Sequence, residues 1–227
     1  MPDPTPAITL YMPDFSSVRL IACAPSAWAV MIALQEKGLS YARQLLSFAD
    51  AEHLSPEMLA RNPRGTIPVL TDGDRVAYEA FAILEYLEHA YPSPPLMPAG
   101  LDARARALTR FHESGNMKTL ALELFSWLMH MPEEALDPDR IEGMAGGLHR
   151  ELALWERYYG EGPWAAGDAI SLADISVFVY LAATVQLGLD VAEWYPNLAR
   201  FHAAMRDRPS VRATWPETWK ERLDLLG

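Results

Sequence analysis

The most informative chemical feature of the sequence is a proline at the mouth of an apolar strand. Pro68 stands in residues 62–70, and a strand is predicted from Ile67 onward. Because proline cannot donate to a sheet ladder, it belongs at a strand start, and the peptide bond before it is a candidate for the cis form. A cis bond would turn the N–H and C=O of Ile67 outward, free to pair with an extended peptide ligand as an added strand does. The alternative is a proline that merely begins a strand.

No metal centre is predicted. Cys23 is the single cysteine, which excludes an internal disulfide and a cysteine-rich metal site. The histidines at positions 89, 130, 149 and 202 show no metal-ligand spacing with one another. The sequence therefore predicts chemistry without a bound metal.

The composition limits the classes of partner. Half of the 227 residues are hydrophobic and 22% are charged, which is ordinary for a packed chain and excludes disordered and fibrous classes. Nineteen Lys and Arg against thirty Asp and Glu give a net charge of −11, so a nucleic-acid backbone or an anionic membrane would be repelled. Residues 1–6 lack the features of a secretory signal, and no segment reaches the roughly 20 apolar residues of a membrane helix. We expect a cytoplasmic protein whose partners are small molecules or other proteins.

Two parts of different structure are expected on either side of a proline-rich connector. Residues 91–100 hold four prolines and a glycine, which forbid a helix and favour an extended chain. Before them, short apolar runs alternate with helical ones, and Asp72-Gly73 joins two of the runs as a hairpin turn. The predicted order is β-α-β, a short helix, then β-β-α, with the main elements at residues 7–11, 26–37, 41–47, 67–71, 75–78 and 80–90.

After the connector, strand signals vanish and apolar residues recur every three or four positions, for example at 148, 152, 155 and 159. Ser171 and Asp174 have the spacing of a capping box, which begins a helix that is apolar nearly all round and must lie in a core. The sequence therefore predicts a mixed α/β domain over residues 1–90, a linker over 91–102 and an all-α domain over 103–227.

Four stretches, at residues 33–41, 62–70, 78–88 and 166–175, resemble the cytosolic glutathione transferases. Each stretch alone is only modestly specific for the family, but the four in this order and spacing are a strong indication of it. The resemblance covers almost the whole chain. It implies a thioredoxin-like βαβαββα domain followed by the helical domain of that family. The start of the chain, with Ser26-Ala27-Trp28, is most similar to a bacterial, YfcF-like branch near the theta, zeta and disulfide-reducing classes.

The resemblance implies a glutathione site with no metal. Ile67 before Pro68 would hydrogen-bond the cysteinyl backbone of the tripeptide. Glu79 would take the γ-glutamyl ammonium, and the helix beginning near Ala80 would favour the carboxylate. The family has serine where this chain has Ala80, a loss of about 0.5–1.5 kcal/mol. His53 would hold the glycyl carboxylate; its alternative is a surface histidine in a polar loop.

The catalytic position departs from the family. The serine or cysteine that keeps the bound thiol ionised falls on Ala24, which has nothing to donate. Ser26 is one candidate donor, with a simple helix cap as its alternative. Cys23 is another, as donor or as nucleophile in a mixed disulfide; its alternative is a buried small hydrophobe. Tyr11 could donate its phenol hydroxyl, as in tyrosine-type members of the family, but the sequence favours packing in the core for it. The last possibility is that backbone amides alone stabilise the thiolate.

The resemblance implies that glutathione, as co-substrate, attacks a small apolar electrophile, a detoxifying transfer. His112 and Asn116 would wall the electrophile pocket; the alternative, which the sequence favours, is an exposed helix face. A homodimer is expected from the family. Two alternatives stay open: a glutathione-dependent disulfide reductase or isomerase, and a non-catalytic binding protein on the same fold.

Overall fold

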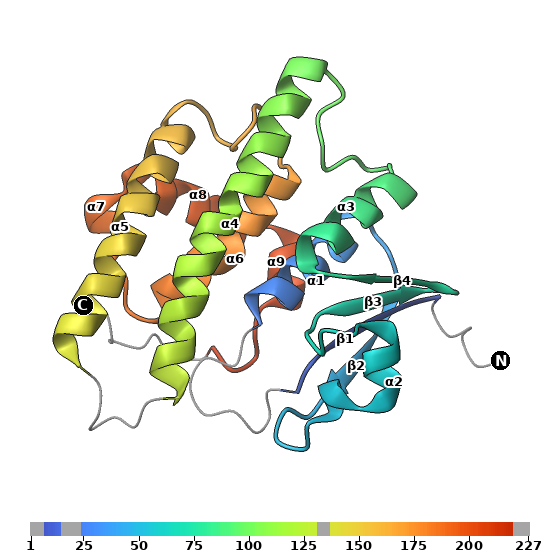
Figure 1. The fold of residues 1–227 in the computed structure, drawn as a ribbon. Helices are drawn as coiled ribbons and strands as arrows, with labels where there is room; N and C mark the ends of the chain where they lie inside the picture. The colour runs from blue at the N-terminus through green and yellow to red at the C-terminus, as the bar shows by residue number, and fades with distance from the viewer. Residues whose placement is uncertain (1–6, 15–23, 131–136, 220–227) are drawn as a thin grey trace. The chain divides into compact units, whose positions relative to one another are not determined.

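The computed structural model describes residues 7–14, 24–130 and 137–219. The chain divides into two compact units, Met1–Leu96 and Met97–Gly227. Each unit is described by itself, and Figure 1 labels its helices and strands.

The first unit has a four-stranded sheet with the predicted order of elements. They are β1 (Ile8–Pro13), α1 (Pro25–Glu36), β2 (Tyr41–Leu46), the 3₁₀ helix η1 (Glu52–Leu54), α2 (Pro56–Arg61), β3 (Val69–Asp72), β4 (Arg75–Tyr78) and α3 (Ala80–Ala90). The strand order is β2-β1-β3-β4, with β1 parallel to β2 and the other neighbours antiparallel. This is the thioredoxin-like βαβαββα arrangement, so the predicted fold class is confirmed.

The two faces of this sheet carry different helices. Leu10 and Met12 of β1 are buried, and side chains alternate along a strand, so Tyr11 points to the opposite face. Tyr11 packs there against a cluster that includes Met58 of α2, and Arg61 of α2 lies over its ring at 5.0 Å from the centroid. Figure 1 shows α2 on one side of the sheet and α1 with α3 on the other. Tyr11 is therefore a packing residue on the α2 face, as the sequence favoured.

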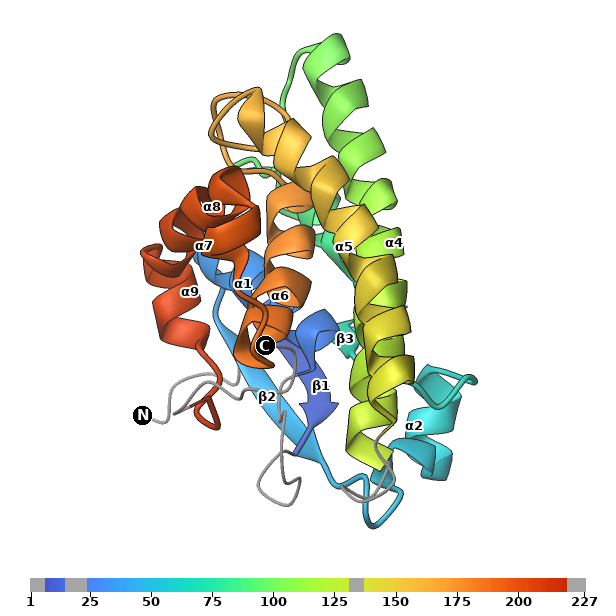
Figure 2. The ribbon, with the colours of Figure 1, turned by 90° about the vertical axis from the view of Figure 1, so that its left-hand side faces the viewer.

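The described part of the second unit is helical. Its helices are α4 (Leu101–His130), α5 (Pro138–Gly160), α6 (Leu172–Gln186), α7 (Val191–Trp194), α8 (Pro196–Arg206) and α9 (Pro209–Thr214). Every residue of α6 from Leu172 to Thr184 is buried, and Figure 2 shows α6 between the α4–α5 pair and helices α7, α8 and α9. The predicted core helix is confirmed. In the described residues, no helix is long and apolar enough to cross a membrane.

The capping box at the start of α6 is also confirmed. Asp174 accepts hydrogen bonds from the Ser171 N–H at 2.8 Å and the Ser171 hydroxyl at 2.7 Å. It also accepts from the Ala165 N–H at 2.8 Å and the Tyr159 hydroxyl at 3.1 Å. Burial raises the pKa of the Asp174 carboxyl, and the donors oppose that rise. The group therefore holds together the start of α6, the preceding loop and α5.

Candidate functional site

The candidate site lies at one edge of the sheet, where several elements begin or end. Because β1 and β2 are parallel, their last residues, Pro13 and Leu46, are register partners at the same edge. Strand β3 runs antiparallel to β1 and begins there, and β4 ends there with Tyr78 opposite Val69. The loop after β2, the segment before β3 and the start of α3 are thereby brought together.

Ile67 and Pro68 stand immediately before β3, and their peptide bond is cis, as predicted. The paired residues of β3 begin at Val69, so Ile67 lies two residues outside the ladder. Its side chain packs on the cluster of Leu46, Met58 and Val69. The side chain therefore anchors the segment, while its main chain lies beyond the strand pairing of the sheet.

The segment before β3 and the start of α3 leave the sheet at the same end. Val69, the first residue of β3, pairs with Tyr78, the last residue of β4, so Ile67–Pro68 on one side and the Glu79 N-cap on the other adjoin this last pair. An extended ligand on the Ile67 main chain would thus reach the helix N-terminus. Backbone pairing and the positive end of a helix are the two features that bind a peptide with a terminal carboxylate.

Glu79 has an unusual backbone conformation at that helix start. It is the N-cap of α3, with φ 66° and ψ 119°, a positive φ that non-glycine residues rarely adopt. Its side chain is exposed and makes no capping hydrogen bond. Ala80, the first residue of the helix, is buried. Glu79 therefore carries an exposed side chain at the α3 N-terminus on a backbone conformation that is strained for a residue other than glycine.

The turn before Ile67 is held by Asn62. This side chain is buried, and its amide donates to the Thr66 carbonyl at 2.7 Å and the Thr66 hydroxyl at 3.0 Å. The Asn62 side-chain oxygen accepts from the Arg64 N–H at 3.1 Å. We did not single out Asn62 from the sequence, although an asparagine before proline is a turn signal that could have identified it.

Gly65 explains how this turn approaches η1. Its φ is +62°, and an added Cβ would lie 2.5 Å from Leu54 Cδ2 and 3.4 Å from Leu59 Cδ2. Both atoms are ends of flexible, exposed leucine side chains, so an added side chain would first displace these tips. The positive φ is therefore the stronger reason for glycine at this position.

His53 lies in η1 and is partly buried. Its ring stacks on Phe48 with centroids 4.1 Å apart, and its Nδ1 is buried with no hydrogen-bond partner among the residues described. The loop is tied at its base, because the Ser47 N–H donates to Glu52 Oε2 at 2.7 Å. The ring therefore packs on Phe48, while its Nδ1 has no hydrogen-bond partner in the part of the chain that the structure describes.

The start of α1 differs from the expectation for Ser26. The N-cap is Ala24, Pro25 is the first helical residue, and Ser26 is the second. The first hydrogen bond of the helix runs from the Trp28 N–H to the Ala24 carbonyl at 2.9 Å. The interpretation of Ser26 as a helix cap is therefore wrong, because Pro25 takes the first helical position and the N-cap lies two residues before Ser26. Cys23 lies outside the described residues.

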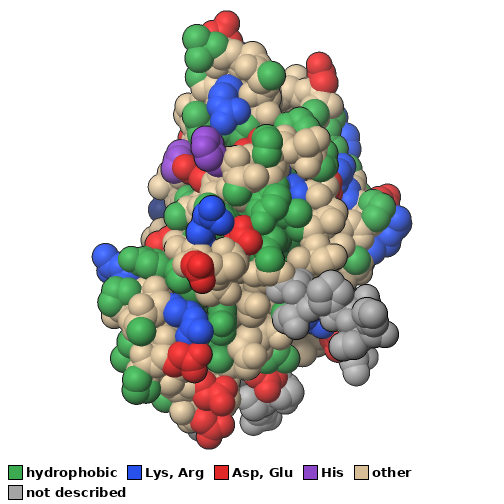
Figure 3. All heavy atoms as spheres, turned by 90° about the vertical axis from the view of Figure 1, so that its right-hand side faces the viewer, with side chains coloured by type: hydrophobic (Ala, Val, Ile, Leu, Met, Phe, Trp, Pro, Cys, Tyr) green, Lys and Arg blue, Asp and Glu red, His purple; other side chains and the backbone are tan. Residues whose placement is uncertain are grey.

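His112 and Asn116 both lie on α4 of the second unit. Both are exposed and four residues apart, so they share one face of the helix. The described residues contain no group of three His, Cys, Asp or Glu side chains that could hold a metal ion. On the face drawn in Figure 3, basic patches stand apart with acidic and hydrophobic side chains between them.

Comparisons with known proteins agree with this geometry. A glutathione S-transferase N-terminal domain model matches residues 24–90, and a glutathione S-transferase C-terminal domain model matches residues 123–215. Glutathione S-transferase A from Pleuronectes platessa is 35% identical over 203 residues, which are 87% of this chain and 90% of the relative.

Solved structures have the same fold. A glutathione S-transferase from the Antarctic clam Laternula elliptica is 33% identical over 96% of each chain, with a TM-score of 0.81. A theta-class enzyme from Xanthomonas axonopodis pv. citri, with glutathione bound, has a TM-score of 0.82 at 24% identity and covers 93% of this chain and 99% of its own.

Proposed function

The chain belongs to the cytosolic glutathione S-transferase family and is a glutathione transferase, and on that premise we propose which of its residues conjugate glutathione to an electrophile. The tripeptide binds along the Ile67 main chain beside Pro68. Its γ-glutamyl ammonium pairs with Glu79, its γ-glutamyl carboxylate lies at the α3 N-terminus beside Ala80, and its glycyl carboxylate is held by His53.

The observation that carries this proposal is the convergence at one sheet edge. Three features lie at this edge: the Ile67–Pro68 segment outside the strand pairing, the Glu79 N-cap of α3, and the His53 ring stacked on Phe48. Two anionic groups and one cationic group of glutathione match an open helix end, an imidazole and a carboxylate. Calorimetry with purified protein tests it: we expect binding with micromolar to millimolar affinity, and no heat at millimolar glutathione would reject it.

Activation of the thiol is assigned to the start of α1. The positive end of the helix stabilises a thiolate, and either the Ser26 hydroxyl or the Cys23 thiol donates to the sulfur. The thiolate then attacks the electrophile, forming a carbon–sulfur bond as the leaving group departs with its electron pair. Replacing Ser26 and Cys23 by alanine singly should raise the apparent pKa of bound glutathione in whichever variant loses the donor. If neither pKa moves, both assignments are refuted.

Glutathione-dependent disulfide reduction is the second candidate, favoured by one observation. The N-cap of α1 is Ala24, which offers no hydroxyl, while the thiol of Cys23 is the adjacent residue in the sequence. Turnover of hydroxyethyl disulfide that is lost in Cys23→Ser, without conjugation of a chlorodinitrobenzene, would favour the reductase. Glutathione binding with neither activity would indicate a binding protein.

The finer features of the protein belong to the same proposal. Residues 1–90 form the glutathione-binding domain and residues 91–102 the linker. Residues 103–227 form the domain that binds the electrophile, with His112 and Asn116 lining the electrophile pocket. The protein is a cytoplasmic homodimer of the bacterial YfcF-like type. Exposed apolar side chains of the first unit support the dimer: Leu45, Phe48, Leu54 and Leu59. Sedimentation of the purified chain at twice the monomer mass is the expected result.

A further inference from the structure

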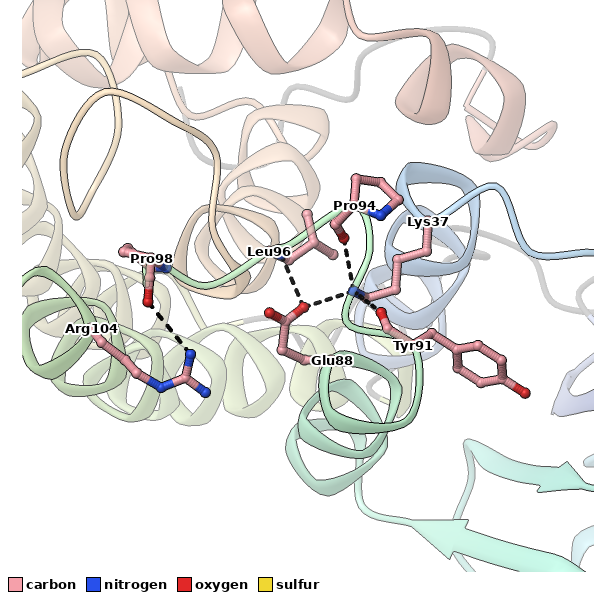
Figure 4. Close-up of polar contacts among 7 residues, drawn as sticks. All are labelled: Lys37, Glu88, Tyr91, Pro94, Leu96, Pro98 and Arg104. Carbon is pink, nitrogen blue, oxygen red and sulfur yellow. Dashed lines mark hydrogen bonds and ion pairs between the residues drawn. The ribbon is translucent and has the colours of Figure 1, made fainter. Parts of the chain in front are cut away.

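A buried lysine joins the end of α1 to the end of α3 and to the connector. Lys37 follows α1, and its side chain is completely buried. Figure 4 shows its Nζ donating to Glu88 Oε2 at 2.7 Å, to the Tyr91 carbonyl at 2.7 Å and to the Pro94 carbonyl at 3.1 Å. An ammonium has three donors, so this one is saturated.

Glu88 completes the arrangement from α3. Its Oε2 also accepts from the Leu96 N–H at 2.9 Å. We call Lys37 and Glu88 the connector clamp, because together they hold residues 91, 94 and 96. Tyr91 has a second tether: its hydroxyl donates to Asp72 at 2.6 Å, which raises the pKa of Tyr91 to about 12.

The connector needs such external partners. Prolines at positions 92, 94 and 95 have no backbone N–H, so the segment has few donors with which to form regular structure. Leu96 is the last residue of the first unit and is buried, and the second unit begins with Met97. The clamp therefore fixes the point at which the chain leaves the glutathione-binding unit.

Stability alone does not explain a buried ion pair here. Taking both charges out of water is costly, and apolar residues of similar size often replace such pairs without loss of stability. An apolar pair, however, could not hold the two carbonyls and the Leu96 N–H. The hydrogen bonds to the connector are therefore what the ion pair provides and an apolar pair would not. This indicates that the clamp specifies the course of the connector.

The clamp is also remote from the proposed thiol site. The helix α1 has 12 residues, so its two ends are about 18 Å apart at 1.5 Å per residue. Lys37 is at the end opposite to Ser26, and Glu88 is near the end of α3 opposite to Glu79. Neither clamp residue touches the proposed glutathione contacts.

We propose that Lys37 and Glu88 are positioning residues for the electrophile step: they fix the course of residues 91–96, the segment by which the chain leaves the glutathione-binding unit. This inference rests on the proposed function. It separates two quantities, because the proposed glutathione contacts all precede the connector in the chain, whereas the proposed electrophile contacts, His112 and Asn116, follow it. A reacting pair held out of position loses rate without losing affinity for the first substrate.

The double variant Lys37→Met/Glu88→Leu tests the proposal in the full chain. We expect the glutathione Kd from calorimetry to change by less than about twofold. The kcat/KM for a chlorodinitrobenzene should fall at least roughly tenfold, with the KM for glutathione unchanged. Hydrogen exchange at the Leu96 amide should accelerate, while the amides of β3 stay protected. Glu57→Gln, which breaks the exposed Glu57–Arg61 pair, is the matched control and should leave all three readouts unchanged.

A conservative variant separates positioning from charge. Glu88→Gln keeps an oxygen for the Leu96 N–H and is expected to retain most of the activity. Glu88→Ala, which removes that oxygen, replaces the double variant if the double variant does not fold. The proposal is overturned if kcat/KM is unchanged in the double variant although the Leu96 amide exchanges fast. It is also overturned if the affinity for glutathione falls by the same factor as kcat/KM. If the unaltered protein does not conjugate glutathione, the proposed function is refuted. The clamp is tested independently, because slow hydrogen exchange at the Leu96 amide in the double variant would refute it whatever the activity.

Discussion

The strained backbone at Glu79 makes a prediction about stability and binding together. Glu79→Gly removes a side chain from a residue at φ 66° and ψ 119°. Relief of such strain is worth about 1–3 kcal/mol, and glycine costs about 0.5–1 kcal/mol through the entropy of the unfolded chain. The net expectation is a gain of roughly 0–2.5 kcal/mol in the free energy of unfolding.

The same variant should bind glutathione less well. It removes a charge-assisted hydrogen bond worth about 1.5–3 kcal/mol, which corresponds to a loss of affinity of roughly 10- to 100-fold. Urea denaturation measures the first effect and calorimetry the second. Glu79→Gln keeps the strained backbone and should lose affinity without gaining stability.

Ala51→Gly is the control for the backbone effect. Ala51 also has a positive φ, 54°, but with ψ 31° it lies in the ordinary left-handed region. We expect it to gain at most about 1 kcal/mol in stability with no change in glutathione affinity. Glycine at an unstrained position lowers stability. A loss of stability in Glu79→Gly would therefore refute the argument that the backbone at Glu79 is strained.

Three further predictions concern the helical unit and the helix start at Ala80. Burial lowers the pKa of His202 to about 4, below its usual 6.5, so the unfolded chain binds a proton more readily. The protein should lose about 3 kcal/mol of stability as pH falls from 6.5 to 4, and His202→Leu should abolish that loss. Asp174→Ala leaves four donors without their acceptor and should cost at least about 3 kcal/mol in urea denaturation. Ala80→Ser should improve the glutathione Kd by about three- to tenfold, measured by calorimetry.

Each of these has a result that would contradict it. An identical pH dependence of stability in His202→Leu and the unaltered chain would mean that His202 is not the titrating group. If Asp174→Ala lowers the free energy of unfolding no more than an ordinary surface substitution does, Asp174 does not hold α5 and α6 together. An unchanged Kd in Ala80→Ser would place the γ-glutamyl end elsewhere.

Local patterns in the sequence were sufficient for much of the architecture. The order of strands and helices in the first unit, the cis Ile67–Pro68 bond, and the Ser171–Asp174 capping box all agree with the sequence prediction. These features depend on residues within a few positions of one another, through proline geometry, apolar periodicity and capping. Such interactions can be read from neighbouring residue types without knowing the fold.

The site required the tertiary structure because its parts meet across the sheet. Only the β3–β4 register brings the segment before Val69 and the residues after Tyr78 to the same end of the sheet, and only the folded turn gives Glu79 its positive φ. The helix α1 begins at Pro25 with Ala24 as its N-cap, whereas the sequence pattern predicted a helix from Ser26.

The connector clamp is the clearest case of information absent from the local sequence. Lys37 and Glu88 are 51 positions apart, and each is typical of an exposed helix residue. Nothing near either residue indicates that it is buried, because burial arises when two helices pack and the connector folds over their ends. The sequence by itself determined which segments form helices, strands and turns; the tertiary structure decided which charges are buried and which helix ends converge, because those depend on packing between residues distant in the chain.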